Sequence, residues 1–208
     1  MTSAPRATIP ELGDLDLVIK TDRLVLRPLR ETDVDDLWPV VSDPEFPKLM
    51  SWEAHRDRGE TVELVQRQAR GIAENTHVVW GIEHDGRIVG CIGLHDITWR
   101  RHAWRLDRAE LGYWLAPALW RRNLMTEAAR EVVNWGFTTL GLHKIVVGCI
   151  EQNAGSRRVI EKLGFRMIGR MVDDVWRDGA WSTHLRFELC ANDWFDVTTT
   201  TPIVRSDP

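Results

Sequence analysis

Residues 109–129 read AELGYWLAPALWRRNLMTEAA, and this stretch decides the fold class. A strand up to Leu115 is followed by a turn at Pro117 and by a helix whose apolar residues recur at helical spacing. The first amides of a helix have no acceptor within it and lie at the positive end of its dipole. The stretch therefore predicts a strand that leads directly into an anion-binding helix start, with Arg121 and Arg122 adding charge. Alternatively, this helix start is basic and solvated and binds no anion.

Outward from this stretch, hydrophobic periodicity predicts a mixed sheet covered by helices. The expected strands span residues 24–29, 77–83, 87–99, 105–115, 144–150, 165–175 and 181–190. The expected helices begin at residue 32 and span residues 60–74, about 122–140, and 154–163. The order is βααβββαβαββ, which indicates an α/β (α+β) protein.

A second informative stretch, NAGSRRVIEKLGF, occupies residues 153–165. Asn153 is a favourable helix cap, and Gly164 suits the left-handed position after a helix. Ser156 is a poor helix former one turn inside the helix, and capping does not account for it. We therefore consider Ser156 a candidate functional residue.

Five segments, in order, resemble the GNAT acyltransferase superfamily, in its RimJ/RimL-like branch of ribosomal-protein N-acetyltransferases. They are TDRLVLRP at 21–28, GLHDI at 93–97, ELGYWL at 110–115, TEA at 126–128 and the stretch at 153–165. The resemblance covers roughly residues 21–195, and the shared order makes it specific although each motif alone is weak. It implies the GNAT fold, a mixed and mostly antiparallel central sheet of about seven strands with helices on both faces.

The resemblance also implies acetyl-CoA as the co-substrate. In this family the two central strands splay apart, the helix start after the fourth strand cradles the pyrophosphate, and pantetheine pairs with exposed backbone. The matching positions form one cofactor-binding set, with Asn153 at the pantetheine and Arg157 or Arg158 at the nucleotide phosphates. The other members are Leu115, Arg121, Arg122, Asn123, Leu124, Met125 and Thr126.

The chain departs from the family pattern in the phosphate loop and at the general acid. Asn123 and Met125 replace small residues, and Arg121 stands where many relatives have glycine; asparagine is the residue that best tolerates positive φ after glycine. Ile160 stands where many relatives have a catalytic tyrosine. In the RimL-like branch the serine of the Asn-x-x-Ser motif substitutes for it, so the resemblance makes Ser156 the hydrogen-bond donor to the leaving thiolate.

An amine that attacks a thioester must lose a proton, so a general base is expected. Glu110 is favoured because the family register turns it toward the cleft, with Trp114 four residues on along the same face. Alternatively, Glu110 is only a solvated carboxylate on the strand, without a role in catalysis. The other candidates are Asp96 and His95, followed by Asp173 and Asp174.

The eleven tryptophans suggest that a subset, such as Trp52 and Trp114, lines a groove for a cationic amine. The expected acceptor is a protein N-terminus or a small-molecule amine. The alternative function is that of a catalytically weak or inactive acyl-CoA-binding regulatory module. The sequence leaves the oligomeric state open, with a homodimer as one possibility.

Length and composition predict one domain over residues 19–197, with flexible arms at 1–18 and 198–208. The net charge of −4 argues against direct nucleic-acid binding. No apolar run approaches the ~20 residues of a membrane span, and no secretion signal is evident. We therefore expect a cytoplasmic protein whose three cysteines are reduced, and no histidine spacing suggests a metal.

Overall fold

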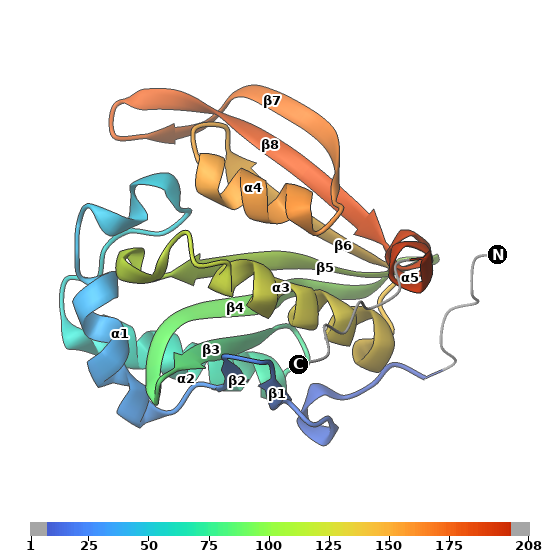
Figure 1. Ribbon diagram of the computed structural model, residues 1–208, viewed down its shortest axis with the longest axis horizontal. Helices are drawn as coiled ribbons and strands as arrows, with labels where there is room; N and C mark the ends of the chain where they lie inside the picture. Colours follow the sequence, from blue (N-terminus) through green and yellow to red (C-terminus); the bar gives the residue numbers. More distant parts are fainter. Residues whose placement is uncertain (1–7, 201–208) are drawn as a thin grey trace, which may run out of the picture.

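One sheet organises the protein (Figure 1). The computed structural model describes residues 8–200, with side chains described through Asp196. In sheet order the eight strands are β1 (Ile19–Lys20), β2 (Val25–Pro28), β3 (Val78–His84), β4 (Arg87–Arg101), β5 (Trp104–Leu115), β6 (Lys144–Ile150), β8 (Ala180–Cys190) and β7 (Arg166–Arg177). Among these described strands only the β5–β6 pair is parallel.

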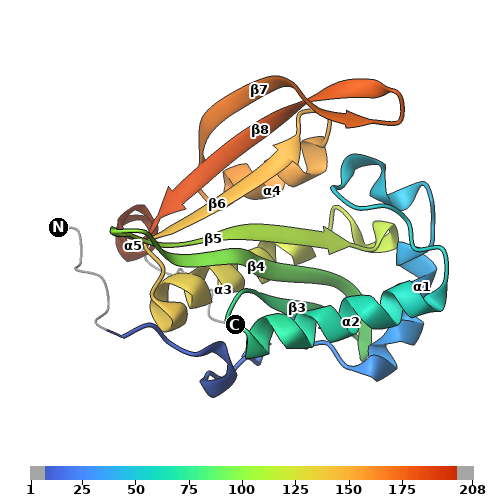
Figure 2. The ribbon, with the colours of Figure 1, turned by 180° about the vertical axis from the view of Figure 1, so that it is seen from behind.

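Helices cover both faces of the sheet, as predicted. In Figure 1, α3 (Leu124–Trp135) and α4 (Ala154–Lys162) lie in front of the strands, and Figure 2 shows α2 (Arg58–Ala73) on the opposite face. The larger hydrophobic core lies under α3, where Trp135 meets Trp80 edge to face at 5.1 Å. A smaller core joins α1 (Val34–Val41) and α2 to β3 and β4. No helix among the described residues is long and apolar enough to cross a bilayer.

The predicted order of elements is confirmed, and β6 has the predicted bounds. The predicted helix over 122–140 is instead α3 followed by a π-helical turn, Gly136–Leu140, which ends at the left-handed Gly141. The structure adds the short strand β1, the helix α5 (Ala191–Thr200) and 3-10 turns at Leu12–Asp14, Glu31–Asp33, Phe46–Leu49 and Pro117–Leu119.

The expectation of a loose N-terminal arm is wrong for residues 8–18. Leu12 is fully buried, because its apolar side chain joins the larger core. Its amide donates to Asn75 Oδ1 at 3.0 Å, and the Trp80 indole donates to the Leu17 carbonyl at 2.6 Å. At the other end α5 continues to Thr200, past the expected boundary at 197. The rest of both predicted arms, residues 1–7 and 201–208, lies outside the described residues.

Candidate active site

The two central strands separate halfway along their length. β5 and β6 pair at three positions only, the last being Glu110 with Val146. Beyond that pair β5 continues to Leu115 beside β4, and β6 continues to Ile150 beside β8. The facing edges, residues 111–115 and 147–150, therefore present backbone groups that are not used in pairing β5 to β6. Such groups require hydrogen-bond partners, so the gap suits an extended ligand that supplies them.

The turn from β5 into α3 exposes a helix N-terminus. Arg121 and Asn123 both have left-handed backbones, with φ of 63° and 61°, so Asn123 adopts the conformation predicted for it at the family's glycine. The Asn123 side chain does not cap α3, and its Oδ1 accepts from Lys162 Nζ at 2.8 Å. By helix geometry the amides of Leu124, Met125 and Thr126 have no acceptor within α3, as an anion site requires.

Charge and hydrogen bonds shape the surroundings of this helix start. Arg121 and Arg122 are exposed beside it. The Trp120 indole donates to the Leu115 carbonyl at 2.7 Å and fixes the turn to the end of β5. Thr126 is half-buried, whereas Leu124 and Met125 are buried in the core, so they can contribute backbone amides but not side chains.

Ser156 lies in a hydrogen-bonded cluster on the α3 side of the splayed strands. Asn153 caps α4 as predicted, accepting from the Ser156 amide at 3.0 Å. Tyr113 Oη lies 3.0 Å from Ser156 Oγ and donates to the Ser156 carbonyl at 3.1 Å. Burial raises the pKa of the Tyr113 phenol, so it remains protonated at neutral pH. Burial also raises the pKa of the Cys149 thiol, against the opposing effect of the nearby Ser156 hydroxyl.

Sequence reasoning did not assign a role to Tyr113. The available signal was that the chain's single tyrosine lies on the strand that borders the cofactor cleft. Strand alternation places its side chain on the opposite face from Glu110. Tyr113 therefore approaches the gap with α4, while Glu110 approaches from the α2 side.

Glu110 forms an ion pair that the sequence did not predict. Its carboxylate accepts from the Arg186 guanidinium at 2.7 Å and 3.3 Å. Trp114, expected beside it, lies on the same face but packs against Phe46 and Trp52 at ring distances of 5.6 Å and 6.2 Å. The Glu110 carboxylate is therefore held by a cation from β8 and remains partly accessible, with a third of its side chain exposed.

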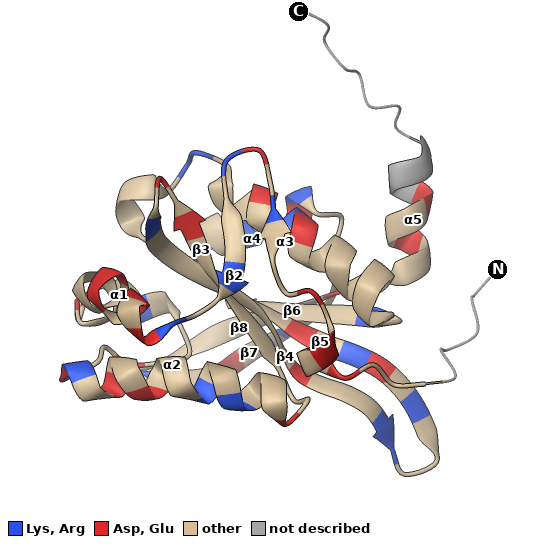
Figure 3. Ribbon diagram, turned by 90° about the horizontal axis from the view of Figure 1, so that it is seen from below, with Lys and Arg blue, Asp and Glu red and all other residues tan. Residues whose placement is uncertain are grey.

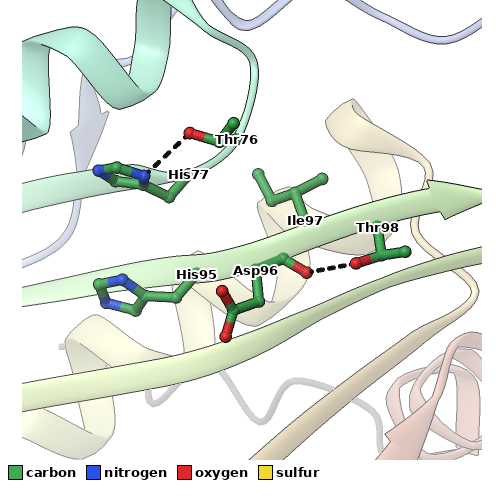
Figure 4. Close-up of a pocket in the computed structure, with 6 residues that line it drawn as sticks. All are labelled: Thr76, His77, His95, Asp96, Ile97 and Thr98. Carbon is green, nitrogen blue, oxygen red and sulfur yellow. Dashed lines mark hydrogen bonds between the residues drawn. The ribbon is translucent and has the colours of Figure 1, made fainter.

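The two other base candidates lie next to Glu110 on β4. His95 is the cross-strand partner of Glu110, and its ring stacks on that of His77 at 6.0 Å. Burial, together with the nearby His77, lowers the pKa of His95, so this imidazole is neutral at pH 7. Asp96 has φ of 48° in a bulge of β4 and is exposed. Both residues line a cavity of about 440 Å³ between β4 and the start of β3 (Figure 4).

The remaining candidates for phosphate binding and for the base differ in their surroundings. Arg158 is exposed on α4, whereas Arg157 is engaged by Glu161 at 2.7 Å. On β7, Asp174 lies 3.5 Å from His184, and Asp173 adopts a left-handed backbone.

Comparison with known proteins agrees with this geometry. The sequence profile described as an acetyltransferase (GNAT) domain matches residues 23–166. The uncharacterized N-acetyltransferase YoaA of Bacillus subtilis is 29% identical over 164 residues, 78% of this chain and 90% of YoaA. The spermidine N(1)-acetyltransferase of Escherichia coli K12 is 26% identical over 77% of this chain and 82% of its own.

Among solved structures, RimL superposes on this chain with a TM-score of 0.76. RimL is a ribosomal L7/L12 alpha-N-protein acetyltransferase, and its structure contains coenzyme A. The superposition covers 85% of this chain and 99% of RimL at 17% sequence identity, which shows a shared fold. The profile match spans more than half of the chain and includes the splayed strands, the exposed helix start and the whole 153–165 stretch that holds Ser156. The chain therefore belongs to the GNAT acetyltransferase family and is an N-acetyltransferase by that membership.

Proposed function

We propose that the protein transfers acetyl from acetyl-CoA to the primary amine of a protein N-terminus or a small molecule, by direct attack in a ternary complex. The observation that carries this proposal is the parting of β5 and β6 next to the uncapped start of α3. The first feature suits an extended pantetheine arm, and the second suits a pyrophosphate. The acceptors of RimL, a ribosomal protein, and of the spermidine enzyme, a small amine, support the two classes of acceptor.

Acetyl-CoA would bind with its pyrophosphate over the amides of residues 124–126. Arg121, Arg122 and the backbone of Asn123 would supply further donors, with Arg158 available to the nucleotide phosphates. The pantetheine would run between the free edges, from Leu115 toward the Asn153 end of α4. Its sulfur would then arrive at the cluster of Tyr113, Ser156 and Cys149.

The RimL complex supports this position of the sulfur. In that structure coenzyme A is joined to a RimL cysteine by a disulfide, so a thiol side chain reaches the cofactor sulfur there. In this chain Cys149 lies at the splayed end of β6, close enough to Ser156 for the hydroxyl to affect the pKa of the thiol.

In the proposed reaction the amine nitrogen attacks the thioester carbonyl, a C–N bond forms, and the C–S bond breaks to release the thiolate. The attacking nitrogen gives one proton to a base, and the thiolate takes up one proton. Tyr113 has a single proton to donate. When that proton is directed at Ser156 Oγ, the serine hydroxyl is free to donate to the departing sulfur, where developing charge most needs a donor.

Glu110 is our proposed base, acting on the amine through water from the face opposite Ser156. In this arrangement the amine approaches the thioester carbonyl from the Glu110 side of the sheet, and the departing thiolate meets Ser156 on the other side. His95 shares the Glu110 face and, being neutral, can accept a proton, and Asp96 follows it along β4. These two residues are the alternatives to Glu110.

Thiol release from acetyl-CoA with a panel of amines, measured beside calorimetric binding of CoA, tests the proposal. Turnover with at least one primary amine is the expected result. CoA binding without turnover would instead identify a catalytically weak acyl-CoA-binding module, which the buried Ile160 at the family's tyrosine position would then explain.

A further inference from the structure

The sheet has an open face beside the proposed reaction centre. On the α2 side, α1 and α2 lie over β3 and β4, and the segment with Phe46 and Trp52 packs on Trp114 at the end of β5. No described helix lies over β6, β8 or the rest of β5 on this side (Figure 2). The register places Glu110, Val146, Gly148 and Arg186 on this face. Small-molecule sites are concave and bury most of their ligand, typically ~70–90% of its surface. A wide face of this kind is instead suited to a chain that lies across it.

Most charges on this face are paired. Arg186 binds Glu110, and Lys144 binds Glu188 at 2.6 Å, with Arg166 as a second partner of that carboxylate. These pairs leave little net charge near the reaction centre.

The face continues along the β4–β5 hairpin, which extends beyond the body of the protein and carries several arginines (Figure 3). Arg108 lies two residues before Glu110 on the same face, and its cross-strand partner is Thr98. Arg100, two residues beyond Thr98, shares this face, whereas the next pair, Arg101 with Trp104, lies on the other.

Three cations along this path have no ion-pair partner among residues 8–196. Arg100 and Arg108 are exposed, and so is Arg67 on α2, which is close enough to contribute to the lowered pKa of His95. Asp96, also exposed, is an anion on this path that has no ion-pair partner within the described part of the chain. The path that leads away from Glu110 is therefore net positive, in a chain whose overall charge is −4.

We propose that the acceptor is a polypeptide whose first residues lie extended along this face, with acidic side chains that meet Arg108 and Arg100. This inference rests on the proposed function, because it places the N-terminal amine at Glu110. At ~3.3 Å per residue, Arg108 is about 7 Å from Glu110 along β5 and Arg100 is about 13–16 Å away. Carboxylates at about the third to sixth positions of the acceptor match these two distances.

The cavity beside this path adds a concave subsite. Its lining includes His77, His95 and Thr98, and the cross-strand partner of Thr98 is Arg108 (Figure 4). Because its pKa is lowered, His95 can offer a hydrogen bond without adding charge. The cavity therefore suits one uncharged polar side chain of the acceptor, while the arginines select acidic side chains.

The test compares kcat/KM of the full chain at saturating acetyl-CoA for four amines. Two are peptides with free N-termini that carry either glutamate or lysine at positions 3–6. The third has its glutamates moved to positions 10–13, and the fourth is glycinamide. At low ionic strength we expect about a tenfold preference for the first peptide over the second and third, declining toward unity near 0.5 M salt because exposed pairs are screened.

Charge reversal with a matched control locates the effect. The double substitution Arg100→Glu, Arg108→Glu should abolish or invert the preference for glutamate over lysine. Arg101→Glu makes the same charge change one residue away on the opposite face of the hairpin and should preserve the preference.

Equal kcat/KM for the glutamate and lysine peptides would overturn the inference, as would an equal effect of Arg101→Glu. Glycinamide acetylated as efficiently as the best peptide would identify a small-molecule acceptor, refuting this inference and leaving the proposed function intact. Failure to acetylate any amine, with CoA bound, would refute the proposed function itself.

Discussion

Replacing Tyr113 by phenylalanine isolates the hydrogen-bond cluster at the end of the splayed strands. The ring keeps its packing, and only the hydroxyl is lost. That hydroxyl lies 3.0 Å from Ser156 Oγ and 3.1 Å from the Ser156 carbonyl oxygen. Without it, Ser156 Oγ loses the contact that we propose directs its proton toward the cofactor sulfur.

The size of the effect follows from the energetics of a buried hydroxyl. A partner left unsatisfied costs ~1–3 kcal/mol. If that cost is borne in the transition state, kcat falls about 5–150-fold, since ~1.36 kcal/mol corresponds to a factor of ten. The start of α3, which would hold the pyrophosphate, is untouched, so acetyl-CoA affinity should change little.

A double-mutant cycle supplies the assay, with kcat measured by thiol release for Tyr113→Phe, Ser156→Ala and the combined variant. Ser156→Ala alone should lower kcat by ~10²–10³ without weakening acetyl-CoA binding. Adding Tyr113→Phe to it should then cost less than about twofold, because both changes act through one hydroxyl. Losses that multiply in the combined variant would refute the coupling. An unchanged kcat in Ser156→Ala would make this serine only a small residue that lets pantetheine approach.

Three further substitutions test the remaining features of the site. Asn123→Pro cannot keep the left-handed backbone and removes an amide donor, so calorimetry should show acetyl-CoA binding weakened by ~10-fold or more. The control Asn123→Gly keeps the left-handed backbone and the amide, so it should bind acetyl-CoA normally. Equal affinities of the two variants would contradict the proposed phosphate site. Glu110→Gln should lose ~10²–10⁴ in kcat/KM together with the acidic limb of the pH–rate profile, and an unchanged profile would transfer the role to His95 or Asp96. The pKa of His95 is lowered from 6.5, so just below that pH the unfolded chain binds more protons than the folded protein. The free energy of unfolding should therefore fall as the pH drops through this range. Urea titrations of His95→Gln should show a smaller fall than those of the wild type. Identical falls would exclude His95 as the cause.

Local sequence signals predicted much of the molecule. The strand at 144–150, the Asn153 cap, the left-handed Gly164 and the left-handed Asn123 all agree with the structure. Each depends on interactions within a few residues, such as capping, strand alternation and the allowed φ of one residue type. The resemblance to the GNAT family ordered these elements into one sheet, and the family match confirms it.

Contacts between distant segments were beyond those signals. The backbone of the buried Leu12 is held by Asn75, which lies 63 residues away and accepts from the Leu12 amide. A composition rich in Thr, Pro and Ser predicts looseness, whereas Leu12 is buried in the larger core and Leu15 and Leu17 pack against it.

The sequence by itself determined the class of fold, the strand that leads into an exposed helix start, and Ser156 as the residue that capping does not explain. Only the tertiary structure decided which groups surround that serine and the proposed base. Tyr113 reaches Ser156 across 43 residues, and Arg186 reaches Glu110 across 76. The first contact joins β5 to α4, which follows β6, and the second joins β5 to β8, so both depend on how β5 lies in the sheet beside strands that are remote in the chain. A shift of one residue would turn each side chain to the other face of the sheet, so the chemistry of the cleft is set by the sheet as a whole.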